Sequence, residues 1–237
     1  SGERRPRGGA ATVAPNIASL GGSAVLVGVV GKDAAAATLS DLLAPLTKSA
    51  RAELVAEAGR PTTIKTRYMG GQHQIVRVDR EEPAPISQET EAAPVAAVGR
   101  LARDCRAVMI SDYAKGALTD RIIKATIDAA RSAGIPVVID PKRADWAAYA
   151  GATVITPNRK ELQLAAHTAC TSDDDCSRAA GIGINATKAA VLLTRSEHGM
   201  SVYRDGKPPL HLSAKAREVF DVSGAGDTVA ASVALGL

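Results

Sequence analysis

The stretch Asp221-Val-Ser-Gly-Ala-Gly-Asp-Thr228 runs directly into the small, apolar segment 229–237. Its glycines permit a tight turn and the alanine-rich segment favours helix, so we expect free backbone N–H groups at a helix N-terminus. Such a helix start can hold an anion, because its first-turn amides lack internal partners and carry partial positive charge. Asp227 lies at the mouth of this expected anion site, where its carboxylate would repel a phosphate. Its presence makes sense if it faces a hydroxyl group that must lose a proton to attack phosphorus.

The match to a known motif is longer than a generic glycine-rich turn. A lone Gly-Ala-Gly would indicate a strand-to-helix turn with Asp227 as the N-terminal cap of the helix. All eight residues of 221–228, however, resemble the C-terminal motif of the ribokinase-like (PfkB) carbohydrate kinases. The resemblance implies that Asp227 is the catalytic base and that the backbone amides of Gly224, Ala225 and Gly226 form the anion hole for the transferred phosphate.

The composition is that of an ordinary soluble globular protein, with 46% hydrophobic and 23% charged residues. No apolar run reaches membrane-spanning length, and residues 1–7 lack an apolar signal core, so we expect a cytoplasmic protein without membrane contact. The net charge is +4, but six dispersed aromatic residues make no base-stacking platform, which argues against a nucleic-acid partner. The charge suits an anionic small molecule such as a sugar phosphate or ATP.

Three cysteines in 237 residues argue against a disulfide framework. Cys170 and Cys176 lie in a polar segment without a histidine at metal-ligand spacing. We therefore interpret both as incidental thiols.

Strand-like and helix-like segments alternate along the chain, which predicts a parallel sheet covered by helices on both faces. The resemblance implies a ribokinase-like three-layer α/β/α sandwich with a mostly parallel central sheet and a small β-sheet lid, forming one kinase domain over residues 1–237. The family's first strand has no counterpart before Gly8, and its last helices have none after Leu237. We expect a break or a late start at Pro94 in the helix candidate that begins near Ser87. We also expect a glycine-rich connection after a helix that ends near Ala180.

Near the N-terminus, two short motifs resemble sugar-binding segments of the family. Gly8 and Gly9 match a Gly-Gly motif that lets the sugar approach the backbone, and Thr12 occupies the place of a sugar-binding asparagine. After the expected strand 24–31, Asp33 should cap the next helix and lie near the sugar. The resemblance thus implies that these residues bind substrate.

Alternating polar and apolar residues on either side of Gly70-Gly71 predict a β-hairpin over about 60–80. The simplest interpretation is a surface hairpin with one solvated face. The segment also resembles the lid of the heptose 7-phosphate kinases within the family, inserted at about 51–80. That resemblance implies that Lys65, Arg67 and Arg77 hold a substrate phosphate, and that a homodimer forms through the lid.

The sequence Asp112-Tyr-Ala-Lys-Gly116 follows another expected strand, where loops of open α/β sheets carry ligands. A polar connection is the alternative interpretation. The segment resembles Asp-Tyr-x-Lys-Gly of the same kinases, with Ala114 where glycine is usual. The resemblance implies that Asp112 contacts a sugar hydroxyl and that Lys115 contacts phosphate.

Asn158 and Glu161 can face the same way at a helix start, either as a capping pair or as the family's Asn-x-x-Glu motif. The resemblance to the family's Asn-x-x-Glu motif implies that this pair organises Mg²⁺ and its bound waters. Segment 194–199 resembles the family's nucleotide loop, with Ser196 in place of a glycine. The resemblance implies that ATP is bound by Asn158, Thr194, Glu197, Gly199 and Gly224.

Taken together, the resemblance implies a kinase that uses ATP and Mg²⁺ to phosphorylate D-glycero-β-D-manno-heptose 7-phosphate at its anomeric hydroxyl, on the route to ADP-heptose and lipopolysaccharide. A kinase for another sugar or phosphosugar is one alternative. A non-catalytic sugar-phosphate binding module is another, because Thr12 and Ser196 depart from the pattern.

Overall fold

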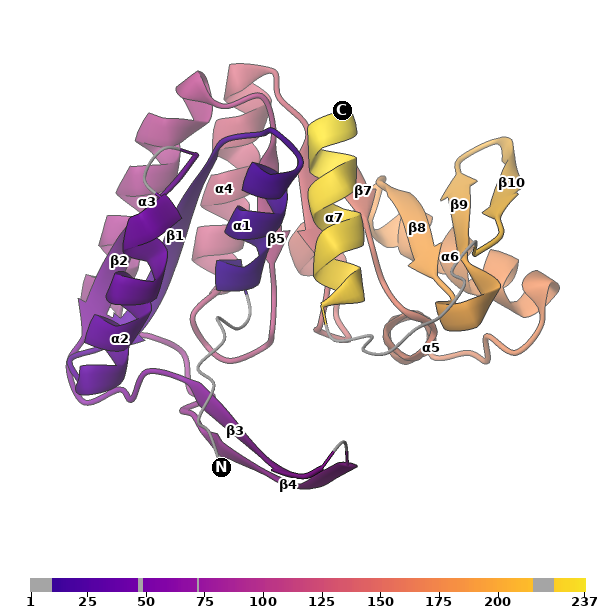
Figure 1. Cartoon of the computed structure of the whole chain (residues 1–237). Coiled ribbons are helices and arrows are strands. Elements are labelled where there is room, and N and C mark those ends of the chain that lie inside the picture. The colour runs from indigo at the N-terminus through magenta and orange to yellow at the C-terminus, as the bar shows by residue number, and fades with distance from the viewer. Residues whose placement is uncertain (1–9, 47–48, 72, 215–223) are drawn as a thin grey trace. The chain divides into compact units, whose positions relative to one another are not determined.

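The computed structural model describes residues 10–46, 49–71, 73–214 and 224–237, which form two compact units (Figure 1). The first unit comprises residues 1–97 with 115–119, and the second comprises 98–114 with 120–237. Within the described ranges, no helix combines the length and the apolar character needed to cross a membrane.

In the first unit, a parallel pair of strands is flanked by helices. The elements are α1 (Ala10–Ser19), β1 (Ala24–Gly31), α2 (Ala34–Leu43), η1 (Ala44–Leu46) and β2 (Ala50–Glu57). β1 and β2 pair from Ala24 opposite Ala50 to Gly31 opposite Glu57. The predicted strand and its following helix are confirmed, and Asp33 caps α2 by accepting the Ala36 N–H.

The predicted hairpin is also confirmed, as β3 (Ile64–Gly70) and β4 (His73–Arg80), a separate antiparallel pair. Lys65 lies opposite Asp79 and Arg67 opposite Arg77 on one face, which we call the cationic face. The other face, which we call the apolar face, holds Ile64, Thr66, Tyr68, Val76 and Val78. Its three large central side chains are exposed, at 55% for Tyr68, 48% for Val76 and 53% for Val78.

Two predicted helix ends are wrong. α3 (Gln88–Leu101) continues through Pro94, where the neighbouring alanines favour helix strongly enough to offset one missing backbone hydrogen bond. α6 (Asp173–Thr187) continues through its glycines. A Cβ at Gly183 would lie 2.6 Å from the Trp146 ring, so this glycine serves helix packing and not helix termination.

The second unit contains a six-stranded sheet in the order β10-β9-β8-β7-β6-β5 (Figure 1). The strands are β5 (Val108–Ser111), β6 (Val137–Asp140), β7 (Val154–Ile155), β8 (Ala190–Thr194), β9 (Met200–Arg204) and β10 (Lys207–Leu212). β5 to β8 pair in parallel, whereas β9 pairs antiparallel with both β8 and β10. The predicted mostly parallel sheet is therefore confirmed.

Helices connect these strands and cover buried aliphatic residues. They are η2 (Ala102–Asp104), α4 (Asp120–Ala133), η3 (Ala147–Tyr149), α5 (Arg159–Ala166), α6, η4 (Ser196–His198) and α7 (Ala225–Gly236). The fully buried side chains include Ile123 of α4, Leu162 of α5 and Ile139 of β6. α7 packs against the neighbouring strands β5 and β6 of this sheet.

The interpretation of Cys170 and Cys176 as incidental thiols is wrong, because they form a disulfide. The loop after α5 ends at a capping box at the start of α6, in which the Ser172 side chain accepts the Asp175 N–H. This turn brings the two Cα atoms to 4.5 Å, and both cysteines are buried. The turn geometry, which residue spacing alone does not reveal, makes the pairing possible.

Two residues that stand where the family pattern has glycine adopt left-handed backbone conformations. Ala114 has φ 51° and Ser196 has φ 52°. This region favours glycine because a Cβ crowds the backbone there. The two departures from the pattern therefore keep the turn geometry and carry backbone strain.

We expect Ala114→Gly to stabilise the protein by about 0.5–1 kcal/mol, because relief of the left-handed strain exceeds the added flexibility of the unfolded chain. Urea denaturation measures the change. Ala144→Gly is the matched control in a loop outside the left-handed region, and it should lose stability. Equal losses in both variants would contradict the strain at Ala114.

Candidate active site

Polar groups of the second unit gather where its parallel strands end. Asp112 and Tyr113 follow β5, Asp140 ends β6, Asn158 follows β7 and Thr194 ends β8. The carboxyl ends of parallel strands lie at one edge of a sheet, which is where open α/β folds bind ligands. The structure thus brings together residues that are far apart in the sequence.

Asp227 lies in the first turn of α7 and is partly buried. The Tyr113 hydroxyl donates a hydrogen bond to its Oδ1 at 2.9 Å. Burial raises the pKa of Asp227 above its usual value, and the hydrogen bond from Tyr113 opposes part of that rise. A carboxylate with a raised pKa is a better proton acceptor than an ordinary aspartate.

The N-terminus of α7 has the open geometry expected of an anion site. Gly224 caps the helix in a left-handed conformation with φ 82°, and its cap involves no side-chain hydrogen bond. Ala225 and Gly226 are exposed, and a Cβ at Gly226 would meet no atom within 4 Å. Residues 221–223 of the motif lie outside the described residues. The anion-hole role of the glycine turn stays a prediction.

Asp140 is a site residue that the sequence reasoning left without a role. Burial raises its pKa to about 7, and the negative charges of Glu161, Asp227 and Asp112 add to the shift, while Lys142 opposes it. The available signal was an acidic residue directly after a buried strand, in Asp140-Pro141-Lys142. Several carboxylates therefore share this edge of the sheet.

Asn158 and Glu161 form a capping box at the start of α5, as one interpretation predicted. The Asn158 side chain accepts the Glu161 N–H at 3.0 Å, and Glu161 Oε2 accepts the Asn158 N–H at 2.9 Å. Lys142 Nζ donates to Glu161 Oε1 at 2.8 Å. Among the described residues, no group of three or more His, Cys, Asp or Glu side chains is arranged to hold a metal ion. A metal role for this pair, through water, stays a prediction.

The predicted nucleotide residues begin beside this pair. The Thr194 N–H donates to the Pro157 carbonyl at 2.9 Å, and Asn158 forms an isolated bridge with Thr194. A Cβ at Gly199 would lie 2.0 Å from the Leu212 carbonyl oxygen, so this glycine has a packing reason of its own. Glu197 is exposed on η4. Contact of these residues with ATP stays a prediction.

Asp112 is buried and has protein partners. Its Oδ1 accepts the Ala114 N–H at 2.7 Å, and its Oδ2 accepts Arg143 Nε and Tyr149 Oη, each at 2.7 Å. These bonds fix the turn after β5. The predicted contact of Asp112 with a sugar hydroxyl is untested, and the structure adds a structural role that the sequence did not reveal.

In the first unit, Asp33 holds the start of the segment that leads to the hairpin. Its carboxylate accepts the Thr62 N–H at 2.9 Å and the Thr62 hydroxyl at 2.7 Å, and the latter bond is the main cause of its lowered pKa. A Cβ at Gly31 would lie 2.2 Å from the Arg60 carbonyl oxygen, so glycine is required there. Thr12 lies within α1, and Gly8 and Gly9 lie outside the described residues.

The predicted phosphate-binding cations of the first unit are gathered around two carboxylates. Lys65 Nζ lies 2.9 Å from Asp79 and 3.2 Å from Glu81, and Lys115 Nζ lies 2.5 Å from Glu81. Arg77 Nε lies 2.9 Å from Asp79. The hydrogen bond from Lys65 lowers the pKa of Asp79, and that from Lys115 lowers the pKa of Glu81. The structure therefore brings three of the four predicted cations into one charged cluster.

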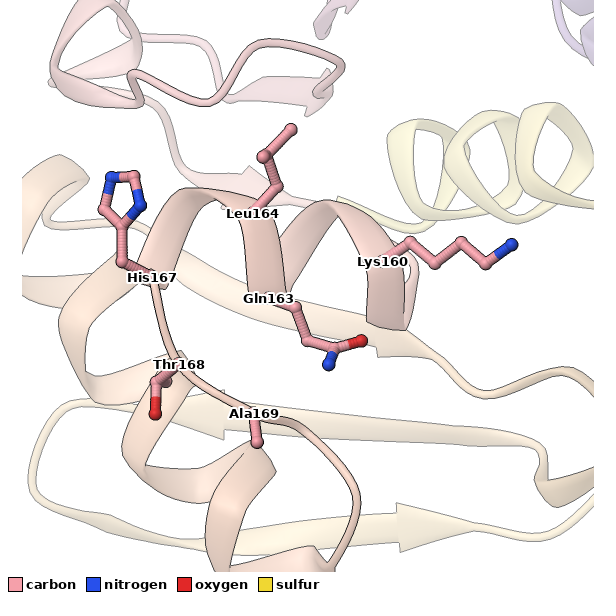
Figure 2. A pocket seen from close by; sticks show the side chains of 6 residues that line it. All are labelled: Lys160, Gln163, Leu164, His167, Thr168 and Ala169. Atoms are coloured by element: carbon pink, nitrogen blue, oxygen red, sulfur yellow. The ribbon is translucent and has the colours of Figure 1, made fainter.

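A surface hollow lies on α5 and the loop after it (Figure 2). Its lining comes from Lys160, Gln163, Leu164, His167, Thr168 and Ala169. None of these residues belongs to the predicted site, and the hollow lacks the buried polar groups that fix a ligand.

Comparison with known proteins relates this arrangement to sugar kinases. The chain is 46% identical over 235 residues to the bifunctional protein HldE of Azorhizobium caulinodans, covering 99% of this chain and 49% of that protein. It is 48% identical over 231 residues to HldE of Caulobacter vibrioides, covering 96% and 47%. The chain thus spans about half the length of these curated relatives.

Solved structures show the same fold. The phosphofructokinase-2 from Escherichia coli in complex with potassium superposes with a TM-score of 0.79 at 22% identity, covering 98% of this chain and 74% of that chain. The Arabidopsis thaliana ribokinase complexed with ribose and ATP gives 0.73 at 20% identity, covering 95% and 72%. The fold is therefore ribokinase-like. Residues 1–237 match the pfkB family of carbohydrate kinases, and the chain belongs to that family.

Proposed function

We propose that this chain transfers the γ-phosphoryl group of ATP to the anomeric hydroxyl of D-glycero-β-D-manno-heptose 7-phosphate, as a single kinase domain. The observation that carries the proposal is the placement of Asp227 in the exposed first turn of α7, with a raised pKa and its Oδ1 held by Tyr113. The choice of sugar is supported by the Asp-Tyr-x-Lys-Gly and lid motifs and by the similarity to HldE proteins.

In the proposed reaction, Asp227 accepts the proton of the anomeric hydroxyl as its oxygen bonds to the γ-phosphorus. The bond from that phosphorus to the β,γ-bridging oxygen breaks, and ADP leaves. The backbone amides of 224–226 would stabilise the negative charge on the transferred group. Positioning and charge neutralisation provide most of the rate enhancement in such transfers.

The acidic edge of the sheet would attract a divalent cation held through water, although no direct set of three or more ligands lies among the described residues. Burial raises the pKa of Asp140 to about 7, the charges of Glu161 and Asp227 add to the rise, and a cation would relieve that repulsion. Oxygen ligands acting through water suit Mg²⁺. Asn158 and Glu161 would hold it in this way, since both Glu161 oxygens already have protein partners. Mg²⁺ would neutralise charge on the ATP phosphates.

The substrate phosphate would bind at the cationic face of the hairpin. Arg67 lies directly opposite Arg77, and opposed like charges destabilise a two-stranded pair. An anion between them would relieve this repulsion. Lys65 and Lys115 complete the proposed set around the same face.

The apolar face of the hairpin supports the proposed homodimer. A two-stranded sheet alone is marginally stable, and this one exposes Tyr68, Val76 and Val78. A second copy of the lid would cover these side chains.

Asp227→Asn should lower turnover by about 10²–10⁴-fold, because the amide cannot accept the proton. ADP release with heptose 7-phosphate measures this, and thermal unfolding checks that the variant folds. Asp128→Asn on the exposed surface of α4 is the matched control and should keep normal turnover. Normal turnover in a folded Asp227→Asn protein would contradict the assignment.

Other sugars in the same assay test the alternative kinases, and sugar-phosphate binding without ADP release would indicate a binding module.

Gly226→Ala should separate stability from activity. Alanine in place of glycine inside a helix favours folding by roughly 0.5–1 kcal/mol, while its methyl group would occupy the space proposed for the phosphate. We expect a higher unfolding midpoint and a turnover reduced by about 10-fold or more. Gly99→Ala in α3, also with no neighbouring atom within 4 Å, should gain stability without losing turnover. Equal turnover in both variants would exclude the anion hole.

Replacement of both Val76 and Val78 by glutamate should convert a dimer into a monomer, because four buried charges would meet at the proposed interface. Light scattering coupled to size-exclusion chromatography measures the mass. Arg67→Glu on the cationic face is the control and should keep the dimer. A wild-type monomer at micromolar concentration would contradict the proposal.

A further inference from the structure

Tyr113 links the end of β5 to the first turn of α7. Its hydroxyl lies 2.9 Å from Asp227 Oδ1, across 114 residues of sequence. Burial raises the pKa of Tyr113, and the charge of Asp227 adds to that rise, so the phenol keeps its proton. Tyr113 is therefore the donor and Asp227 the acceptor of this hydrogen bond.

The backbone around Tyr113 is fixed by its neighbours. Asp112 accepts the Ala114 N–H at 2.7 Å and pairs with Arg143 Nε at 2.7 Å. Ala114 is held in a left-handed conformation with φ 51°. Strained turns of this kind persist where the surrounding structure determines them. The Tyr113 ring is thus presented from a turn with little freedom to move.

Other charged groups also face Asp227 from the elements packed beside it. Asp140 ends β6 and interacts with Asp227 through its charge, and Asp140 is in turn influenced by Glu161 of α5 and by Lys142. Asp112 after β5 is paired with Arg143. Since the neighbours of Asp227 on this edge are mostly acidic, a neutral hydroxyl donor is the contact that favours its ionised form.

We propose that Tyr113 is a positioning residue for Asp227: its hydroxyl holds Oδ1 and turns Oδ2 toward the acceptor hydroxyl of the substrate. This inference rests on the proposed kinase function, in which Asp227 is the base. A carboxylate anchored through one oxygen loses its rotational freedom, so the other oxygen stays aligned with the proton it accepts.

The hydrogen bond also sets the direction of a pH effect. Burial raises the pKa of Asp227 and Tyr113 lowers it, so loss of the hydroxyl raises that pKa further. The base must be ionised to act. The acidic limb of the pH profile for kcat should therefore move to higher pH when the hydroxyl is removed.

Tyr113→Phe tests the proposal, with Tyr203→Phe as the matched control. The Tyr203 hydroxyl is buried and has no hydrogen-bond partner among the described residues, so its loss removes the same atom without affecting a carboxylate. We expect Tyr113→Phe to lower kcat by about 10-fold, the scale of one hydrogen bond to a charged group, and to shift the acidic limb upward. Tyr203→Phe should change neither kcat nor the limb.

A titration that needs no turnover separates this inference from the proposed function. NMR of ¹³C-labelled aspartate carboxyl groups follows Asp227 and Asp140 individually, with Asp227→Asn and Asp140→Asn used to assign the signals. The proposal requires a higher pKa of Asp227 in Tyr113→Phe than in the wild type. The proposal would be overturned if the pKa of Asp227 were the same in Tyr113→Phe as in the wild type. It would also be overturned if the wild type were active and the acidic limb of the pH profile were the same in both proteins. Absence of sugar-dependent ADP release by the wild type, with the pKa of Asp227 still shifted, would overturn the kinase proposal and with it the role of the carboxylate as a base.

Discussion

The parallel pairing of β5, β6, β7 and β8 is the constraint on which the candidate site depends. In-register pairing places Ser111 beside Asp140 at the ends of β5 and β6, so the residues that follow these strands leave the sheet at one edge. Backbone hydrogen bonds and buried aliphatic side chains hold this edge in place. The acidic side chains there repel one another and are partly desolvated, which no isolated loop would maintain. The stability of the sheet core therefore supports an unfavourable but chemically useful arrangement.

Much of the fold could be predicted from local patterns, because they report backbone preferences directly. The apolar run 24–31 is a strand, and the alternation around Gly70-Gly71 is a hairpin. The Asn158 and Glu161 spacing gives a capping box. Predictions failed where tertiary packing overrides the local preference. Gly183 provides space for Trp146 within a continuous helix, and Pro94 is accommodated inside α3.

The site itself was only partly accessible to sequence reasoning. The motif around Asp227 identified the proposed base, because several residue types must coincide to build an anion-binding helix start. The Tyr113 partner of that base lies 114 residues away, and no spacing rule relates the two. The charge interaction that raises the pKa of Asp140 and the Cys170–Cys176 disulfide likewise arise from three-dimensional proximity. Sequence patterns indicate which groups to propose as reacting groups, whereas the three-dimensional fold shows which residues are their partners.

The opposed Arg67 and Arg77 of the β3–β4 hairpin have a consequence for how that hairpin interacts with dissolved ions. The Debye length is about 8 Å at physiological ionic strength, and residues directly opposite in an antiparallel pair lie about 4.5–5.5 Å apart at their Cα atoms. Salt therefore screens the mutual repulsion of Arg67 and Arg77 only partly, and it screens the influence of distant charges much more. Within the hairpin, the Asp79 carboxylate lies 2.9 Å from Arg77 Nε and offsets part of that repulsion. In the proposed function, inorganic phosphate and other small anions would therefore compete with the substrate phosphate for the same two guanidinium groups, and added inert salt would weaken that competition only in part.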